Sequence, residues 1–135
     1  FGRPDMALFK FTKNIIKNNH IELFNSGKHS RDFSYIDDIT EGIKLIIDST
    51  PNKKIPYEIY NIGNGETRSL LKYLNEIEKN IGKKAKLKKM PLQIGDIKKT
   101  HSNIKKIRDN FGYKPKTDIT LGIKNFINWY KSYFR

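Results

Sequence analysis

Residues 57–82 combine a strand-like run, a glycine turn and an amphipathic helix, and this order constrains the fold strongly. Residues 57–62 are rich in the β-branched and aromatic side chains that favour strands. Gly63-Asn64-Gly65 is typical of a turn. Thr67 is placed to cap the helix that follows, and Gly82 is placed to end it. The stripe of that helix is formed by Leu70, Leu71, Leu74, Ile77 and Ile81. The sequence therefore predicts an α/β fold in which short strands pack with helices.

The remaining elements follow from the same periodicities. Apolar stripes predict further helices over residues 4–18, 39–48, 101–110 and 120–134. Alternation predicts strands over residues 21–25 and 83–89, the second of them exposed and rich in lysine. No internal repeat divides the chain, and no linker is long enough to do so. We therefore expect one domain over residues 1–135.

Composition excludes several classes of protein. The chain contains no cysteine, so it has neither a disulfide framework nor a thiolate metal site. No apolar run approaches the roughly 20 residues of a membrane span. His20, His29 and His101 lack the spacing of metal ligands, and we expect all three at the surface. A cytoplasmic protein without a membrane or metal partner is the expectation.

The net charge of +13 raises the question of a polyanionic partner. The excess is carried mainly by lysine, which accompanies many isoleucine and asparagine residues, and all three are encoded by A/T-rich codons. Genome composition is therefore the favoured explanation of the charge. Attraction of a charged nucleotide and binding of nucleic acid are the alternatives.

One arginine and three aspartates lie between residues 31 and 38. Arginine offers two parallel N–H donors that match two phosphate oxygens, so Arg31 is a candidate anion ligand. A surface ion pair of Arg31 with Asp32 or Asp37 is the alternative. Asp37-Asp38 precedes an apolar stripe, which favours helix capping over acid–base chemistry or metal binding. Gly63-Asn64-Gly65 lacks the further glycine of a dinucleotide-binding loop, which favours a tight turn.

Several motifs resemble those of nucleotide-sugar epimerases. Gly2-Arg3-Pro4-Asp5-Met6-Ala7 is similar to a segment that follows a Tyr-Gly-Pro-Trp turn in UDP-glucuronate 4-epimerases. The segment from Arg31 to Asp38 resembles a motif of the wider epimerase/dehydratase family. Gly95-Asp96 and the closing Gly112-Tyr113-Lys114-Pro115 follow at similar positions. The chain thus resembles the extended short-chain dehydrogenase/reductase family, and the UDP-glucuronate 4-epimerases within it.

The resemblance implies a C-terminal, substrate-binding portion of a Rossmann-type enzyme whose N-terminal Rossmann core is missing. The whole enzyme would be an NAD-dependent isomerase of polysaccharide biosynthesis, a homodimer that epimerises UDP-glucuronate at C4 through a 4-keto intermediate. NAD would be bound by the missing domain, which would also supply the Tyr-x-x-x-Lys pair of the reaction. This chain has neither that pair nor a glycine fingerprint, so we expect it to contain no catalytic or cofactor-binding residue and to be inactive alone.

The resemblance also implies roles in substrate binding. Arg31 would contact the diphosphate, Asp96 the ribose hydroxyls, and Arg3 the diphosphate or the sugar. Met6 and Phe24 would lie around the uracil. Gln93 stands where many relatives have a phosphate-binding arginine, and Ser30 where they often have a basic residue. Another nucleotide-sugar 4-epimerase, a 4,6-dehydratase and a basic nucleic-acid-binding module are the alternative functions.

Overall fold

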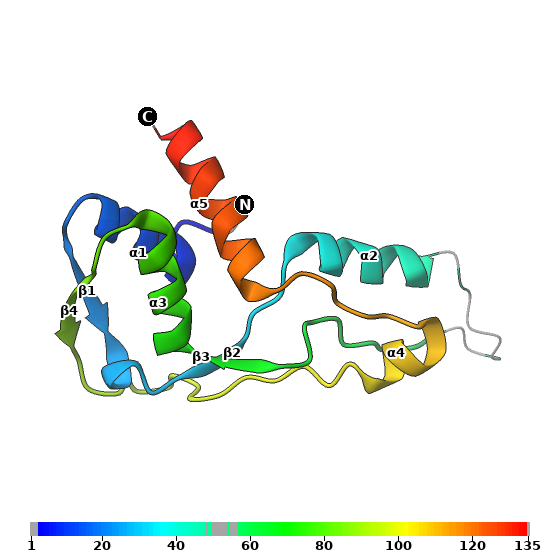
Figure 1. Ribbon diagram of the computed structural model, residues 1–135. Helices are drawn as coiled ribbons and strands as arrows, with labels where there is room; N and C mark the ends of the chain where they lie inside the picture. Colours follow the sequence, from blue (N-terminus) through cyan, green and yellow to red (C-terminus); the bar gives the residue numbers. More distant parts are fainter. Residues whose placement is uncertain (1–2, 48, 50–53, 55–56, 135) are drawn as a thin grey trace.

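The computed structural model describes residues 3–47, 49, 54 and 57–134. Its helices are α1 (Ala7–Ile16), α2 (Ile36–Ile47), α3 (Leu70–Ile81), α4 (Lys105–Phe111) and α5 (Ile119–Tyr133). Its strands are β1 (His20–Leu23), β2 (Ser30–Asp32), β3 (Thr67–Ser69) and β4 (Lys86–Lys89), and the 3-10 helix η1 (Phe24–Gly27) follows β1. One end of the molecule holds α1, α3, β1 and β4, and the other holds α2 and α4 (Figure 1). The segments around β2 and β3 join the two ends.

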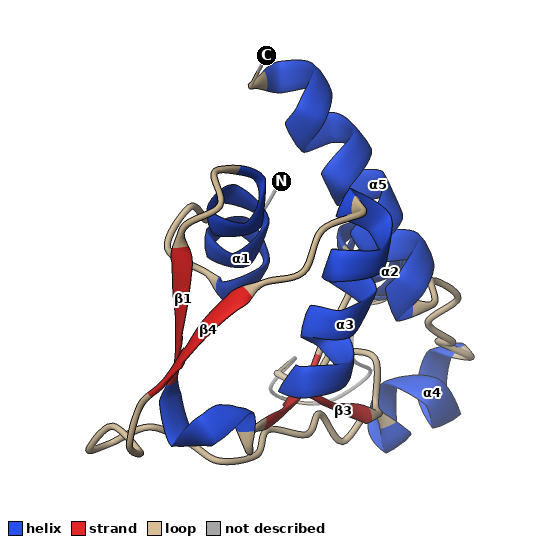
Figure 2. Ribbon diagram, turned by 60° about the vertical axis from the view of Figure 1, so that its left-hand side comes forward, coloured by secondary structure: helices blue, strands red, loops and turns tan. Residues whose placement is uncertain are grey.

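The strands form two small sheets. β1 pairs in parallel with β4, from His20 opposite Lys86 to Leu23 opposite Lys89, and the two strands lie side by side near α1 in Figure 2. β2 pairs antiparallel with β3. On its other side β2 meets residues 98–100, because Ser30 donates to the carbonyl of Lys98 and accepts from the amide of Thr100. β2 is therefore the middle strand of a narrow three-stranded arrangement.

The hydrophobic core lies between α1, α3, α5 and β1. On α3 the predicted stripe is only partly buried, because Leu71 is 45% exposed and Tyr73, outside that stripe, is buried. Leu74 and Ile77 of α3 are buried, as are four residues of α5. Those four are Ile123, Phe126, Ile127 and Tyr130. Gly82 ends α3 in the left-handed conformation, with a φ of 81°. The predicted α/β class is confirmed, and so are the helices α3 and α5.

The strand predicted over residues 57–62 is wrong. Exposure alternates along this segment as it does in a strand, yet among the described residues it has no ladder of backbone hydrogen bonds. Its contacts are instead with α4, where Lys106 pairs with Glu58 and donates to the carbonyl of Ile59 at 2.9 Å. Strand propensity is not sufficient, because a strand also needs a neighbour to complete its hydrogen bonds.

Two expected helix caps are also wrong. Ser69, not Thr67, caps α3, because its hydroxyl accepts from the amide of Lys72 and Thr67 belongs to β3. α2 begins at Ile36, so Asp37 and Asp38 lie inside its first turn. Their negative charges there still interact favourably with the helix dipole. Asp38 is buried and accepts hydrogen bonds from the amides of Lys116 and Thr117, at 2.9 and 3.0 Å. It therefore fixes the approach to α5 and does not cap its own helix.

Other boundaries differ by a few residues. α4 begins at Lys105 rather than at residue 101, and the predicted strand over 21–25 gives way to η1 at Phe24. The expected end of the helix at Asp48 lies outside the described residues. None of the helices in the described part of the chain is both long and apolar enough to span a bilayer.

Candidate functional site

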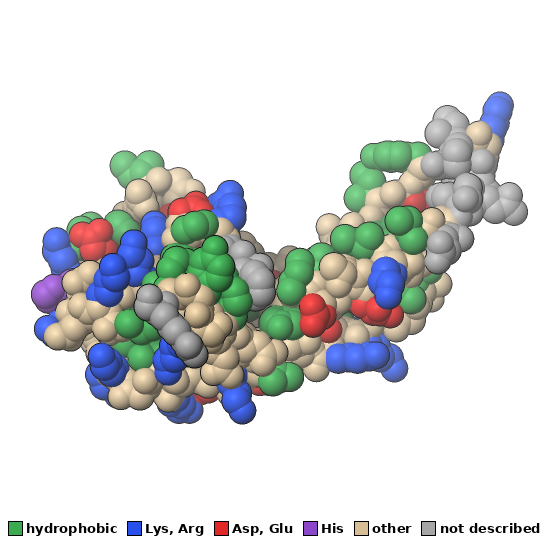
Figure 3. Space-filling view, turned by 90° about the horizontal axis from the view of Figure 1, so that it is seen from above, with side chains coloured by type: hydrophobic (Ala, Val, Ile, Leu, Met, Phe, Trp, Pro, Cys, Tyr) green, Lys and Arg blue, Asp and Glu red, His purple; other side chains and the backbone are tan. Residues whose placement is uncertain are grey.

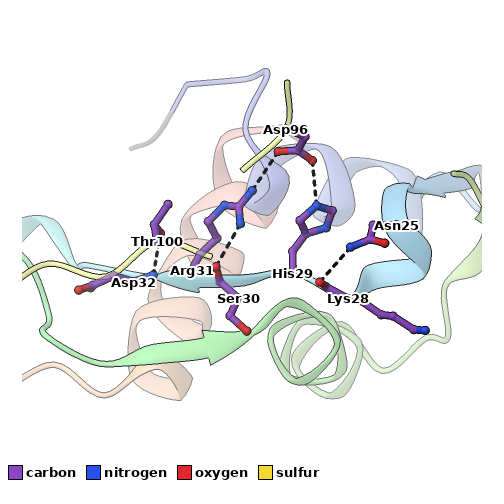
Figure 4. A network of polar contacts seen from close by, with 8 residues as sticks. All are labelled: Asn25, Lys28, His29, Ser30, Arg31, Asp32, Asp96 and Thr100. Atoms are coloured by element: carbon purple, nitrogen blue, oxygen red, sulfur yellow. Dashed lines mark hydrogen bonds and ion pairs between the residues drawn. The ribbon is translucent and has the colours of Figure 1, made fainter. Parts of the chain in front are cut away.

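Two side chains that flank Ser30 converge on one carboxylate. His29 directly precedes β2 and Arg31 lies within it, and because they are two residues apart their side chains project to the same side. Arg31 donates from Nη2 to Oδ1 of Asp96 at 3.1 Å and from Nη1 to the carbonyl of Ser30 at 3.1 Å. His29 Nε2 lies 2.9 Å from the other carboxylate oxygen, Oδ2. Figure 4 shows both side chains pointing toward Asp96.

The backbone brings Asp96 to this position. Residues 98–100 run beside β2, which places the chain just before them next to Arg31. Gly95 has a φ of 81°, a conformation that glycine adopts without strain. The amide of Asp96 donates to the carbonyl of Gln93 at 3.1 Å, closing a turn. The turn presents the Asp96 carboxylate to β2.

Arg31 does not form the ion pair with a nearby residue that was considered from the sequence. The partner is Asp96, 65 residues further along the chain, rather than Asp32 or Asp37. The Arg31 and Asp96 side chains are 27% and 30% exposed, so both remain within reach of a ligand. Two of the predicted site residues are therefore in direct contact.

His29 corrects a prediction made from the sequence. It was expected at the surface, but only 4% of its side chain is exposed. His29 lies directly before β2, beside the start of α3 and the turn that carries Asp96. Its carbonyl also accepts from the amide of Leu70, which joins it to the start of α3. Burial of a histidine beside a carboxylate depends on tertiary contacts, so no local signal identified it.

Asp32 lies on the opposite side of β2 and organises the turn at residues 63–65. Its carboxylate accepts from the amides of Asn64, Gly65 and Ser102, at 3.0, 3.0 and 2.9 Å. Its own amide donates to Thr100 Oγ1 at 3.2 Å. The amides that a phosphate loop would offer are thus used by Asp32, which supports the interpretation of Gly63-Asn64-Gly65 as a turn. Sequence reasoning considered Asp32 only as a partner of Arg31.

The turn is also held from the side of α4. The Tyr113 hydroxyl donates to the Gly63 carbonyl at 2.9 Å. Burial, together with the nearby charges of Asp38 and Asp32, raises the pKa of Tyr113, so its hydroxyl stays protonated and remains a donor. A Cβ at Gly63 would lie 2.6 Å from Cβ of Ser102, so a larger residue there would separate the two segments.

The other predicted site residues are less closely connected. Phe24 is half-buried at the start of η1, which contacts residues 90–91 through the amides of Asn25 and Ser26. Gln93 is exposed. Arg3 pairs with Asp5 at 3.3 Å and contacts Met6 Sδ at 3.4 Å. Within the described residues, no hydrogen bond or ion pair joins Arg3 or Met6 to the Arg31–Asp96 pair.

Two further features delimit the possible sites. An open pocket of about 220 Å³ is lined by Phe33, Arg68, Lys116 and their neighbours, and it includes none of the six predicted site residues. Among the residues that the structure describes, no three His, Asp or Glu side chains are grouped as metal ligands. Arg31 and Asp96 therefore form the best-defined candidate for ligand binding.

Comparisons with known proteins relate the chain to a family of nucleotide-sugar enzymes. Residues 2–63 match the model of the NAD dependent epimerase/dehydratase family. UDP-glucuronate 4-epimerase 5 of Arabidopsis thaliana is 41% identical over 147 residues, which cover 99% of this chain and 34% of that protein. Protein CapI of Staphylococcus aureus is 38% identical, over 100% of this chain and 45% of its own length.

Solved structures resemble the fold closely. UDP-glucuronic acid 4-epimerase from Bacillus cereus, in complex with UDP-glucuronic acid and NAD, has a TM-score of 0.87 and 30% identity, covering 97% of this chain and 41% of that one. UDP-glucose 4-epimerase from Thermotoga maritima has a TM-score of 0.85 at 21% identity, a likeness of fold alone. The chain spans between 39% and 45% of the length of three curated relatives, protein CapI among them.

Proposed function

Because this chain is related to the NAD-dependent epimerase/dehydratase family, we propose that it is the nucleotide-sugar-binding portion of a UDP-glucuronate 4-epimerase. The longer protein would interconvert UDP-glucuronate and UDP-galacturonate through a 4-keto intermediate. The observation that carries the proposal is the partly exposed ion pair between Arg31 of β2 and Asp96. It supplies a forked cation for a diphosphate beside an acceptor for ribose hydroxyls.

We further propose that the chain is the C-terminal part of that protein. The match to the family model occupies residues 2–63, a position that also fits an N-terminal Rossmann portion. Three features favour the C-terminal assignment. The sequence has no Gly-x-x-Gly-x-x-Gly run and no Tyr-x-x-x-Lys pair. The described strands form two separate pairs rather than one parallel sheet. Residues 57–62 have no strand partner among the described residues.

The residues present do not fit NAD. A dinucleotide needs free backbone amides at a glycine-rich turn, usually at a helix N-terminus. In the turn at residues 63–65, Asp32 already accepts from the amides of Asn64 and Gly65. The hydride chemistry of the reaction would therefore be supplied from outside this chain.

The side chains of this chain would bind and orient the substrate. A diphosphate would compete with Asp96 for the Arg31 guanidinium, whose two parallel donors match two phosphate oxygens. Asp96 would then accept from the ribose hydroxyls. Met6, half-exposed at the start of α1, and Phe24 offer apolar surface for the uracil. Arg3 is 73% exposed and would approach the diphosphate or the sugar carboxylate, and Gln93 would add a neutral polar contact.

A basic nucleic-acid-binding module is the rival function from another class. On the face shown in Figure 3, Lys and Arg side chains are spread among acidic and apolar ones rather than gathered into one stripe. Nucleic-acid-binding surfaces instead cluster basic side chains, often with aromatic ones. The spread of charge favours a small anionic ligand.

Filter binding separates the two functions. We expect the longer protein to bind UDP with an affinity that changes little between low and moderate salt, because Arg31 and Asp96 are partly shielded from solvent. Single-stranded RNA should bind weakly, and its binding should fall steeply as salt rises. Tight binding of RNA together with no binding of UDP would refute the proposed function.

A further inference from the structure

We propose that His29 is a positioning residue of the nucleotide site, which holds the Asp96 carboxylate in place for the ribose hydroxyls. The inference rests on the proposed function, because it takes the Arg31–Asp96 pair as the site of the nucleotide. It concerns a residue that sequence reasoning placed at the surface. His29 is instead buried beside the one carboxylate of the candidate site.

The geometry gives each carboxylate oxygen its own partner. Arg31 Nη2 donates to Oδ1 at 3.1 Å, and His29 Nε2 lies 2.9 Å from Oδ2. The His29 contact has ion-pair distance but lacks the alignment of a hydrogen bond. A small rotation of the Asp96 side chain would align it. Both side chains project to the same side of the chain and approach the carboxylate from there (Figure 4).

The two partners differ in how freely they can move. The Arg31 side chain is 27% exposed, and its long stem lets the guanidinium turn toward an incoming diphosphate. The His29 side chain is 4% exposed, and its carbonyl is bonded to the amide of Leu70. When Arg31 turns to the phosphate oxygens, Asp96 loses one partner and keeps the other. His29 is therefore the contact that holds Asp96 while the nucleotide is bound.

The burial of His29 has an energetic reason on this account. A buried imidazole nitrogen without a partner is unfavourable, and the Asp96 oxygen 2.9 Å from His29 Nε2 can supply that partner. The same contact restrains the Asp96 carboxylate. An Asp96 released by Arg31 and without His29 would be free to rotate about its side-chain torsions, since Arg31 and His29 are the partners of its carboxylate among the described residues. The orientation of the Asp96 carboxylate affects most strongly the binding of the ligand group that it contacts directly. On the proposed function that group is the ribose.

Two nucleotides that differ only in the ribose test this role. The dissociation constants of UDP and of 2′,3′-dideoxy-UDP are measured for the longer protein and its variants. We expect the wild type to prefer UDP, and His29→Leu to lower that preference on the order of tenfold, since the polar contact of His29 with the charged Asp96 carboxylate is lost. His29→Gln, which retains an N–H donor, should keep most of the preference. His20→Leu, a change at the exposed start of β1, should leave it unaltered.

A purely structural role would give a different pattern. If His29→Leu weakens both nucleotides equally, or neither, the positioning role is refuted. A second comparison guards against a His29→Leu protein that folds poorly. In a protein that already carries Asp96→Ala, adding His29→Leu should change the preference for UDP over 2′,3′-dideoxy-UDP no further. A further change in that background would also refute the role. A wild type that binds neither nucleotide would instead refute the proposed function itself.

Discussion

Replacing Arg31 by alanine is expected to weaken UDP binding by about 2–4 kcal/mol, or roughly 30- to 700-fold, because the diphosphate loses a forked, charge-assisted donor. The phosphate oxygens lose their cation, and the negative charge of Asp96 is left without the Arg31 guanidinium between it and the anionic ligand. Isothermal titration of UDP into the longer protein measures the change.

Two further variants define the cause of that loss. Arg31→Lys should recover only part of the affinity, since lysine offers a point charge rather than two parallel donors. Arg108→Ala is the matched control, because Arg108 is an exposed arginine of α4 that pairs with Asp109 at the far end of the molecule. If Arg31→Ala binds UDP as the wild type does, Arg31 is only the partner of Asp96 and the proposed site is wrong.

Replacing Asp32 by alanine is expected to lower the free energy of unfolding by about 2–4 kcal/mol, because several backbone amides lose their acceptor at once. The carboxylate serves Asn64, Gly65 and Ser102, which are 32, 33 and 70 residues away. All three hydrogen bonds lie just beyond the short pairings that β2 makes with β3 and with residues 98–100. The turn at residues 63–65 and the segment that leads to α4 should separate from β2.

Urea denaturation compares the variants. Asp32→Asn should be intermediate, because one carbonyl oxygen remains as an acceptor. Asp37→Ala removes an exposed acidic residue in the first turn of α2, where only the helix dipole is affected, and should cost about 0.5 kcal/mol. An Asp32→Ala protein as stable as Asp37→Ala would mean that water replaces the carboxylate without loss.

The sequence predicts the helices of this chain far better than its strands. The stripes of α3 and α5 are local patterns, and a helix completes its hydrogen bonds within itself. Residues 57–62 have the composition of a strand, but pairing depends on a neighbour elsewhere in the chain or beyond it. β2 and β3 have three residues each, too few for an alternation to be recognised.

The candidate site was predictable to the extent that its residues belong to motifs that resemble known ones. The resemblance selected both Arg31 and Asp96, and the structure places them 3.1 Å apart. Neither spacing nor composition pairs residues so distant along the chain. The environments of His29 and Asp32 were missed for the same reason, because each is defined by neighbours that folding brings together. The uracil-binding roles of Met6 and Phe24, and the roles of Arg3 and Gln93, stay predictions.

The most direct test of the account is epimerisation by the longer protein that contains this chain. The protein is incubated with NAD and UDP-glucuronate, and the configuration at C4 of the sugar is followed by proton NMR. Parallel reactions contain UDP-glucose and dTDP-glucose. The account predicts a mixture of UDP-glucuronate and UDP-galacturonate, with slower reaction of the other two sugars. Conversion of UDP-glucose or dTDP-glucose alone, with UDP-glucuronate left unchanged, would contradict it.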